Sequence, residues 1–146
     1  MPICEIHFPK NLLEKQEIEK ITDRLTNVLL QAEGFEINQI SRSLCLINMI
    51  PSDSIFIGGK ISEHAKIVIK IHVFEDAYSD TVKQELIKEI TKIFIEENKI
   101  SREQDGNNVW CIIFPIGNNN FGAGGRIATL EDTKKFISLM SEEIKQ

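Results

Sequence analysis

The sequence repeats one pattern of strand, helix and strand, and this repetition limits the fold more than any other feature. The predicted strands are short apolar or loosely alternating runs, whereas the predicted helices carry apolar residues three and four positions apart. Each half closes on two glycines, a basic residue and an isoleucine. The predicted elements are strands over residues 2–8, 40–50, 67–74 and 109–116 and helices over residues 12–32 and 79–98.

Short sequence matches relate the two halves and indicate a tandem duplication. One match lies at a displacement of 65 residues, two lie at 66, and one in the helices lies at 68, which predicts three extra loop residues before the second helix. The matches are Ile6-His7 with Ile71-His72, Cys45 with Cys111, Gly58–Ile61 with Gly124–Ile127, and Lys15-Gln16-Glu17 with Lys83-Gln84-Glu85.

Chain geometry narrows the architecture to an α+β fold. Two strands joined by a helix of this length pair in parallel through a right-handed crossover. The halves therefore complete a four-stranded mixed sheet with both helices on one face. A short return strand follows at residues 55–60, a polar, glycine-rich loop at residues 117–125, and a last helix at residues 130–144. We expect one domain, with the first repeat at about residues 2–61 and the second at about 66–127.

The sheet face opposite the helices has no cover within this chain, although the strand centres are apolar. Such a face needs a partner. We expect a closed homo-oligomer in which the sheets pack about a shared axis and the return segments reach neighbouring chains.

Composition narrows the class of partner. The 146 residues carry a net charge of -5, with 42% hydrophobic and 27% charged residues. An acidic chain without clustered Lys and Arg is not expected to bind nucleic acid or an anionic membrane surface. Neither a leader pattern nor an apolar run of about 20 residues is present, so we expect a cytoplasmic protein. Its three thiols are expected to stay reduced: Cys4, Cys45 and Cys111.

Proline directly follows the initiator methionine. Cellular removal of Met1, which favours a small or proline second residue, leaves Pro2 with a free secondary amine. An α-amino group has a pKa near ~7.7–8.0, and an apolar pocket lowers that pKa by disfavouring the charged form. Pro2 then suits general base catalysis near neutral pH. In the alternative reading, a proline at this position has no catalytic meaning.

Three motifs stand at fixed places in the duplicated pattern: residues 2–8, 57–59 and 121–126. With them the chain resembles the tautomerase superfamily, whose founding example is 4-oxalocrotonate tautomerase (4-OT). The resemblance covers residues 2–127, and the length resembles fused members such as malonate semialdehyde decarboxylase and cis-3-chloroacrylic acid dehalogenase. It implies a homotrimer, no cofactor, Pro2 as the catalytic amine, and a small 2-oxo, enol or unsaturated acid as substrate.

The chain departs from this family at its arginines. The first-loop arginine falls at Leu12, and the second-strand arginine falls at Leu44 and, in the second half, at Trp110. The dehalogenase's water-activating tyrosine and glutamate fall at Ile112 and Ala123, so hydrolytic dehalogenation is not expected. These apolar replacements predict an apolar pocket that favours a neutral amine and weakens carboxylate binding.

Six residues are candidates for contact with a substrate. Arg126 suits a bidentate carboxylate clamp, or it forms a surface ion pair instead. Phe121 lies where the family has a pocket aromatic, or it packs in the core or at an interface instead. The other candidates line the pocket, donate hydrogen bonds to the substrate, or serve only packing and turns: Trp110, Tyr78, Asn120 and Leu44.

His7 and His72 occupy equivalent strand positions, which the duplication explains without a metal. No acidic or cysteine partner stands at a usable spacing, so we expect no metal site. The glycine-rich run lacks the residues of a phosphate loop or a dinucleotide fingerprint.

The leading hypothesis is a cofactor-free tautomerase or isomerase that uses Pro2 as a general base on a small keto-enol substrate. The first alternative is decarboxylation of a β-keto acid, with cationic Pro2 as the acid. The second is a trimeric binding or structural protein that has lost the chemistry. Retention of Met1 would favour this last reading, because it leaves no proline amine.

Overall fold

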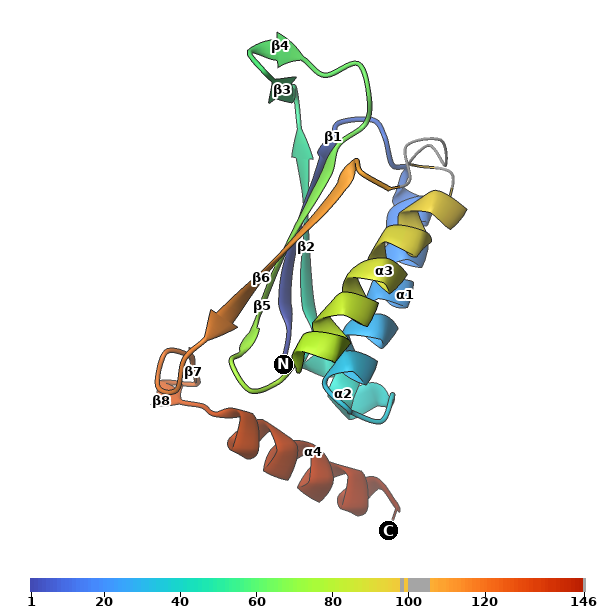
Figure 1. Ribbon diagram of the computed structural model, residues 1–146. Coiled ribbons are helices and arrows are strands. Elements are labelled where there is room, and N and C mark those ends of the chain that lie inside the picture. The colour runs from blue at the N-terminus through green and yellow to red at the C-terminus, as the bar shows by residue number, and fades with distance from the viewer. Residues whose placement is uncertain (98, 100–105, 146) are drawn as a thin grey trace.

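The computed structural model describes residues 1–97, 99 and 106–145 of the chain. Its elements follow the duplicated order, with a short hairpin after each second strand (Figure 1). They are β1 (Ile3–Pro9), α1 (Lys15–Ala32), α2 (Gln39–Ser43), β2 (Leu46–Ser52), β3 (Phe56–Ile57), β4 (Lys60–Ile61), β5 (Ile67–Phe74), α3 (Asp80–Glu96), β6 (Val109–Ile116), β7 (Gly122–Ala123), β8 (Arg126–Ile127) and α4 (Leu130–Lys145).

The sheet has the order β2-β1-β5-β6. The pairs β1–β2 and β5–β6 are parallel, as crossover helices require, and the central pair β1–β5 is antiparallel. Helices α1 and α3 lie side by side on one face (Figure 1). The predicted α+β fold is therefore confirmed. Alternate residues of the two central strands are buried beneath the helices: Cys4, Ile6, Phe8, Ile67, Ile69, Ile71 and Val73.

Local sequence defines both ends of α1. A capping box joins Glu14 and Glu17 at its start. At its end, the Gly34 N–H donates to the carbonyl oxygen of Gln31 and the Phe35 N–H donates to that of Leu30, at 2.9 and 3.1 Å. This is the Schellman pattern, and Gly34 supplies its left-handed residue with φ +80°. The predicted stop at Gly34 is confirmed.

The strand predicted over residues 40–50 is wrong in its first part, where the chain forms α2. The Asn38 side chain accepts hydrogen bonds from the Ile40 and Ser41 N–H groups, both at 2.9 Å, and the Ser41 hydroxyl accepts from the Asn38 N–H at 3.1 Å. This capping box favours a helical turn over an extended chain. Leu44 ends the turn, and Leu46 on edge strand β2 is 49% exposed rather than buried on both sides.

Helices α1 and α3 correspond at a displacement of 65, not 68. Their N-caps are Glu14 and Ser79, and the buried Leu25 corresponds to the buried Ile90. The three-residue match at 68 is therefore not a structural equivalence, and no extra loop residues precede α3. The predicted end of this helix at residue 98 lies outside the described residues; α3 ends at Glu96.

The strand register also revises the cysteine match. Cys111 pairs with Ile69, whereas Cys4, the counterpart of Ile69, pairs with Ile47. The structural counterpart of Cys111 is therefore Ile47 rather than Cys45. A difference of two residues leaves each side chain on the same sheet face.

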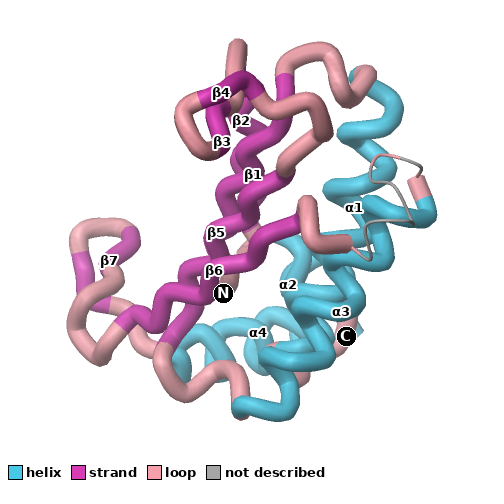
Figure 2. Tube along the Cα trace, turned by 45° about the horizontal axis from the view of Figure 1, so that its top comes forward, coloured by secondary structure: helices cyan, strands magenta, loops and turns pink. Residues whose placement is uncertain are grey.

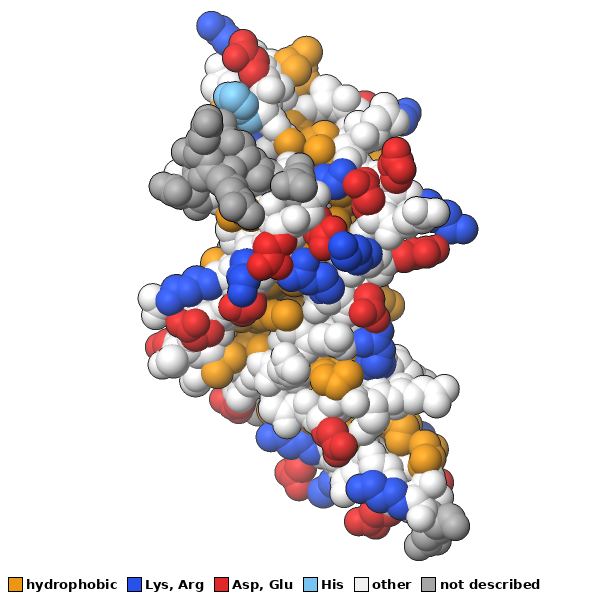
Figure 3. Space-filling view, turned by 90° about the vertical axis from the view of Figure 1, so that its right-hand side faces the viewer, with side chains coloured by type: hydrophobic (Ala, Val, Ile, Leu, Met, Phe, Trp, Pro, Cys, Tyr) orange, Lys and Arg blue, Asp and Glu red, His pale blue; other side chains and the backbone are white. Residues whose placement is uncertain are grey.

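The sheet face opposite the helices carries exposed apolar side chains on both edge strands. On β6, Trp110, Ile112 and Phe114 are 56%, 42% and 38% exposed. By contrast, the outer surface of the helices carries mixed charges (Figure 3), among them the ion pairs of Arg24 with Glu96 and Glu97. The open face of the sheet, and not the outer surface of the helices, therefore has the apolar character of a protein interface.

Helix α4 follows the second hairpin and crosses the end of the sheet beside α2 (Figure 2). It buries Thr133 and Ile137 and leaves Phe136 and Leu139 exposed. No helix among residues 1–97, 99 and 106–145 is long and apolar enough to cross a bilayer.

Replacing Gly34 tests the left-handed end of α1. Gly34→Ala is expected to lower the free energy of unfolding by about 1 kcal/mol, because an L-residue with a Cβ is strained at positive φ. No atom lies within 4 Å of the added Cβ, so the expected loss of stability comes from backbone strain and not from a steric clash. Gly34→Asn, which tolerates this conformation better, is the matched control in urea unfolding. Equal losses for the two variants would contradict the explanation.

Candidate active site

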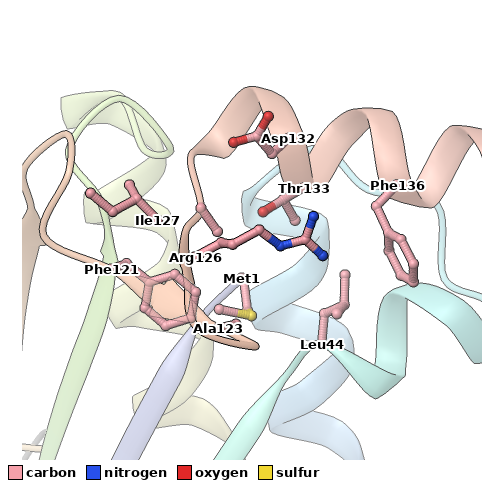
Figure 4. A pocket seen from close by; sticks show the side chains of 10 residues that line it. Met1, Leu44, Phe121, Ala123, Arg126, Ile127, Asp132, Thr133 and Phe136 are labelled. Carbon is pink, nitrogen blue, oxygen red and sulfur yellow. The ribbon is translucent and has the colours of Figure 1, made fainter.

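A cavity of about 500 Å³ opens at the end of the sheet where the chain begins. Its size lies within the usual range for small-molecule sites. The start of the chain, the end of α2, the loop after β6, the second hairpin and α4 surround it (Figure 4). Its lining residues are Met1, Leu44, Phe121, Ala123, Arg126, Ile127, Ala128, Asp132, Thr133 and Phe136.

The start of the chain forms part of this cavity. Met1 lines it, and Pro2 is buried directly behind Met1. The Pro2 carbonyl accepts a hydrogen bond from the Leu46 N–H at 3.1 Å, which fixes this residue at the end of the sheet. While Met1 is present, the Pro2 nitrogen is an amide. Removal of Met1 would turn the Pro2 nitrogen into a secondary amine beside the cavity.

The terminal ammonium group has a specific partner. The nitrogen of Met1 donates to both carboxylate oxygens of Glu33, at 2.6 and 2.7 Å. The Glu33 side chain has no solvent-exposed area. Burial raises the pKa of Glu33, and the opposing charges of the amine and Lys134 lower it in part. Sequence analysis missed Glu33; the available signal was an acidic residue immediately before the helix-ending Gly34.

Tyr78 lies behind the chain terminus rather than in the cavity wall. It is 3% exposed, and its hydroxyl donates to the carbonyl oxygen of Leu29 at 3.2 Å. Burial raises its pKa, with smaller contributions from Glu33, Cys45 and Cys4. The hydroxyl is therefore neutral and already engaged with the backbone.

Three of the sequence candidates meet in the cavity. Arg126 on β8 extends its guanidinium group toward the space between Thr133 and Leu44, above Met1 (Figure 4). Phe121 lies beside Met1 on the other side (Figure 4). Ion pairs in the described part of the chain involve other cations, such as Arg24 and Arg42, so Arg126 has no carboxylate partner among these residues.

Trp110 and Asn120 do not line this cavity in the single chain. Trp110 lies near the start of β6, at the opposite end of the sheet, where its indole N–H donates to the Asn107 carbonyl oxygen at 2.9 Å. The Lys66 ammonium group lies 5.5 Å from the centroid of that ring. Asn120 is exposed in the turn that follows β6, and its N–H donates to the Gly117 carbonyl oxygen.

The two equivalent histidines lie apart. His7 pairs with Val68, whereas His72 pairs with Ile3, which separates the histidines by four positions along the strand register. His72 stacks on Phe114 with ring centroids 4.8 Å apart. The histidines therefore do not converge on a shared ligand position.

The second repeat does not reproduce the amine. At the displacement of 65, Ile67 takes the place of Pro2, and its N–H donates to the Asn108 carbonyl oxygen at 2.8 Å as part of the continuous chain. The duplication therefore leaves one terminal amine site for each chain.

The cavity combines three chemical elements: a chain terminus, an arginine and an apolar lining. An amine at its wall can accept or donate one proton, and a guanidinium group can hold a carboxylate or a developing enolate. The apolar side chains of the lining can contact an apolar part of a substrate. The arrangement suits proton transfer on a small acid with an apolar body.

Comparisons with known proteins bear on the fold. The sequence matches no family model and no curated protein. A wild-type fused 4-OT, an asymmetric trimer, is 21% identical, with a TM-score of 0.71 over 86% of this chain and 95% of its own. A member of the cis-3-chloroacrylic acid dehalogenase family is 16% identical, with a TM-score of 0.74 over 98% and 99%.

A macrophage migration inhibitory factor-like protein from Entamoeba histolytica is also similar. It is 17% identical, with a TM-score of 0.67 over 87% of this chain and 98% of its own. Likeness at these identities shows the fold. The chain therefore has the fold of the tautomerase superfamily, which its duplicated pattern and its motifs predicted.

Proposed function

We propose that the mature chain, starting at Pro2, is a cofactor-independent tautomerase. The Pro2 amine is the general base that moves a proton on a small keto-enol substrate of the 2-oxo acid type. The observation that carries this proposal is that Met1, which is bonded to the buried Pro2, lines a cavity that Arg126 also lines (Figure 4). The fold neighbours agree with it, because fused 4-OT is among them.

Each residue of the site has a separate role in the proposed reaction. The neutral Pro2 amine accepts a proton from the substrate, and its ammonium form returns that proton at the second position. Arg126 holds the substrate carboxylate and stabilises the charge that develops on the adjacent oxygen. Phe121, Leu44 and Ile127 contact the apolar part of the substrate. Trp110, Tyr78 and Asn120 have no contact role within a single chain.

Decarboxylation of a small β-keto acid is the second candidate. The observation that favours it is the buried Glu33 carboxylate at the chain terminus, since a negative neighbour favours a protonated amine. A cationic Pro2 would then donate its proton to the carbanion left by carbon dioxide. Release of carbon dioxide distinguishes this reaction from isomerisation.

We also propose that the chain forms a homotrimer and acts in the cytoplasm. The exposed apolar residues of the open sheet face support an assembly, and the fused 4-OT neighbours are trimers. The same trimer without chemistry is the non-enzymatic alternative. Retention of Met1, whose nitrogen contacts Glu33, would favour that reading.

Three predictions test the proposed function, and the first concerns the amine itself. The ketonisation of phenylenolpyruvate is expected to be faster with the mature chain, and Pro2→Ala is expected to lower kcat/KM by about 10²-fold or more, because it removes the secondary amine base. The kcat/KM value should rise with pH through the amine pKa, since the base acts only when deprotonated. Ultraviolet absorbance follows the reaction, and intact mass confirms that Met1 is absent.

A matched variant carries one extra serine ahead of Pro2 after methionine removal. It retains the proline ring but converts the Pro2 nitrogen into an amide, so it is expected to lose the activity. If the extended and mature chains are equally active, Pro2 is not the base.

The second prediction concerns the carboxylate clamp. Arg126→Ala is expected to raise KM for an enol acid by about 10-fold or more, because a charge-assisted hydrogen bond contributes about 1.5–3 kcal/mol. Lys60→Ala, which removes the basic residue at the corresponding place in the first hairpin, is the control. Equal effects in steady-state kinetics would contradict a clamp at Arg126.

The third prediction concerns the assembly. Three copies of the 16.7 kDa chain give a mass of about 50 kDa by light scattering. Ile112→Lys on the open face is expected to produce monomers, because it places a second cation beside Lys70, its partner in the strand register. Lys88→Glu on the exposed surface of α3 is the control. A trimer that survives Ile112→Lys would place the interface elsewhere.

A further inference from the structure

The Glu33 carboxylate is the group closest to the chain terminus that the proposed mechanism leaves without a role. It contacts the terminal nitrogen with both oxygens, and its side chain is fully buried. We propose that Glu33 is the counter-ion of the Pro2 amine in the mature chain, a positioning residue that stabilises the ammonium formed when Pro2 accepts the proton. This inference rests on the proposed function and assigns a further residue to the same site.

Backbone geometry keeps the carboxylate within reach after Met1 is removed. Consecutive backbone nitrogens lie less than about 4 Å apart, so the Pro2 nitrogen lies within about 7 Å of Glu33. Pro2 is held by the hydrogen bond from Leu46, and Glu33 is held by the Schellman end of α1. Neither group needs a change of fold to approach the other, directly or through one water molecule.

Few other charges face Glu33. Burial raises the pKa of Cys45 to about 11 and raises that of Tyr78 as well, so both are neutral at pH 7. Lys134 on α4 contributes a positive charge but is exposed to solvent. Arg126 and Asp132 line the same cavity as Met1. The terminal amine is therefore the one cation in the described residues that contacts Glu33 away from bulk water.

Its place at the C-cap of α1 gives Glu33 no evident structural benefit. A carboxylate at a helix C-terminus meets the negative end of the helix dipole, and burial adds a desolvation cost. Both effects are offset only by a positive partner. Such a partner exists at the chain terminus, and there the carboxylate favours the charged form of an amine.

The proton balance of the step is simple. A C–H or O–H bond of the substrate breaks, its electron pair stays on the enolate, and the proton forms an N–H bond to Pro2. Glu33 stays ionised and faces the new ammonium group, much as a buried aspartate supports a catalytic imidazolium. The same N–H bond then breaks as the proton returns to the second carbon, so no co-reactant is consumed.

The test is a titration of the Pro2 amine in mature chain labelled with 13C-proline. The sequence has four prolines, of which Pro2 alone carries an amine, so one set of ring-carbon signals titrates with it. Glu33→Gln is expected to lower the titration midpoint by about one pH unit, because it removes the neighbouring negative charge. Glu36→Gln, at an exposed position three residues later, is the matched control and leaves the midpoint unchanged.

The pH dependence of ketonisation supplies the second readout. The kcat/KM midpoint of Glu33→Gln shifts down with the NMR midpoint, and its plateau falls by up to about tenfold, since one pKa unit is a tenfold change. Glu33→Asp, which retains the charge, is expected to keep the midpoint close to that of the mature chain, and it guards against misfolding of the first variant. A purely structural role would lower the rate without moving the midpoint.

The outcomes separate the two proposals. Equal NMR midpoints in the mature chain, Glu33→Gln and Glu36→Gln overturn the counter-ion assignment, whatever the activity. If the NMR midpoint shifts in Glu33→Gln but the mature chain does not accelerate ketonisation, the result supports Glu33 as the counter-ion and contradicts the tautomerase function.

Discussion

The antiparallel contact between β1 and β5 is the constraint on which the rest of the structure depends. It joins two parallel strand pairs into one sheet, and both strands bury alternate residues beneath α1 and α3. Because β1 is a central strand, the beginning of the chain cannot fray away from the sheet. Residue 2 is therefore fixed between β2 and β5, at the end of the molecule that α2, α4 and the second hairpin enclose. A terminal amine is ordinarily mobile and solvated; here its place is defined by the core.

Much of this fold could be predicted from sequence, because the spacing of apolar residues and the geometry of the connections determine it. The apolar spacing of residues 12–32 and 67–74 predicts a helix and a strand, and the crossover rule then fixes parallel pairing. The failures have local causes. At Asn38 and Ser41, side-chain hydrogen bonds make residues Gln39–Ser43 a helix, although a strand was predicted there. A chance match of three polar residues gave the wrong displacement for the helices, because polar surface residues do not define structural equivalence while buried ones do.

The site was less predictable than the fold. Pro2, Arg126, Phe121 and Leu44 have chemical or family signals that sequence reasoning can use, and the last three line one cavity with Met1. Ungapped counting matched Trp110 with Leu44, but the strand register gives Leu46 as the counterpart of Trp110. Trp110 pairs with Val68, whereas Leu46 pairs with Ile3, the counterpart of Val68. The signal for Glu33, an acidic residue just before the helix-ending Gly34, was weak, since an acidic residue near a helix end is usually solvated. Only the meeting of α1 with the start of β1 shows that it is buried against the chain terminus.

The apolar cavity and the buried carboxylate act on the amine in opposite directions. Removal of water disfavours an ammonium group, which suits a neutral base, while Glu33 favours it. The two effects on the pKa of the Pro2 amine are compatible, because a general base is most effective when its pKa lies near the working pH rather than far below it. An apolar pocket alone would make Pro2 a weak base, and a carboxylate alone would keep it fully protonated. With both present, the same nitrogen can accept a proton from one atom of a substrate and return it to another.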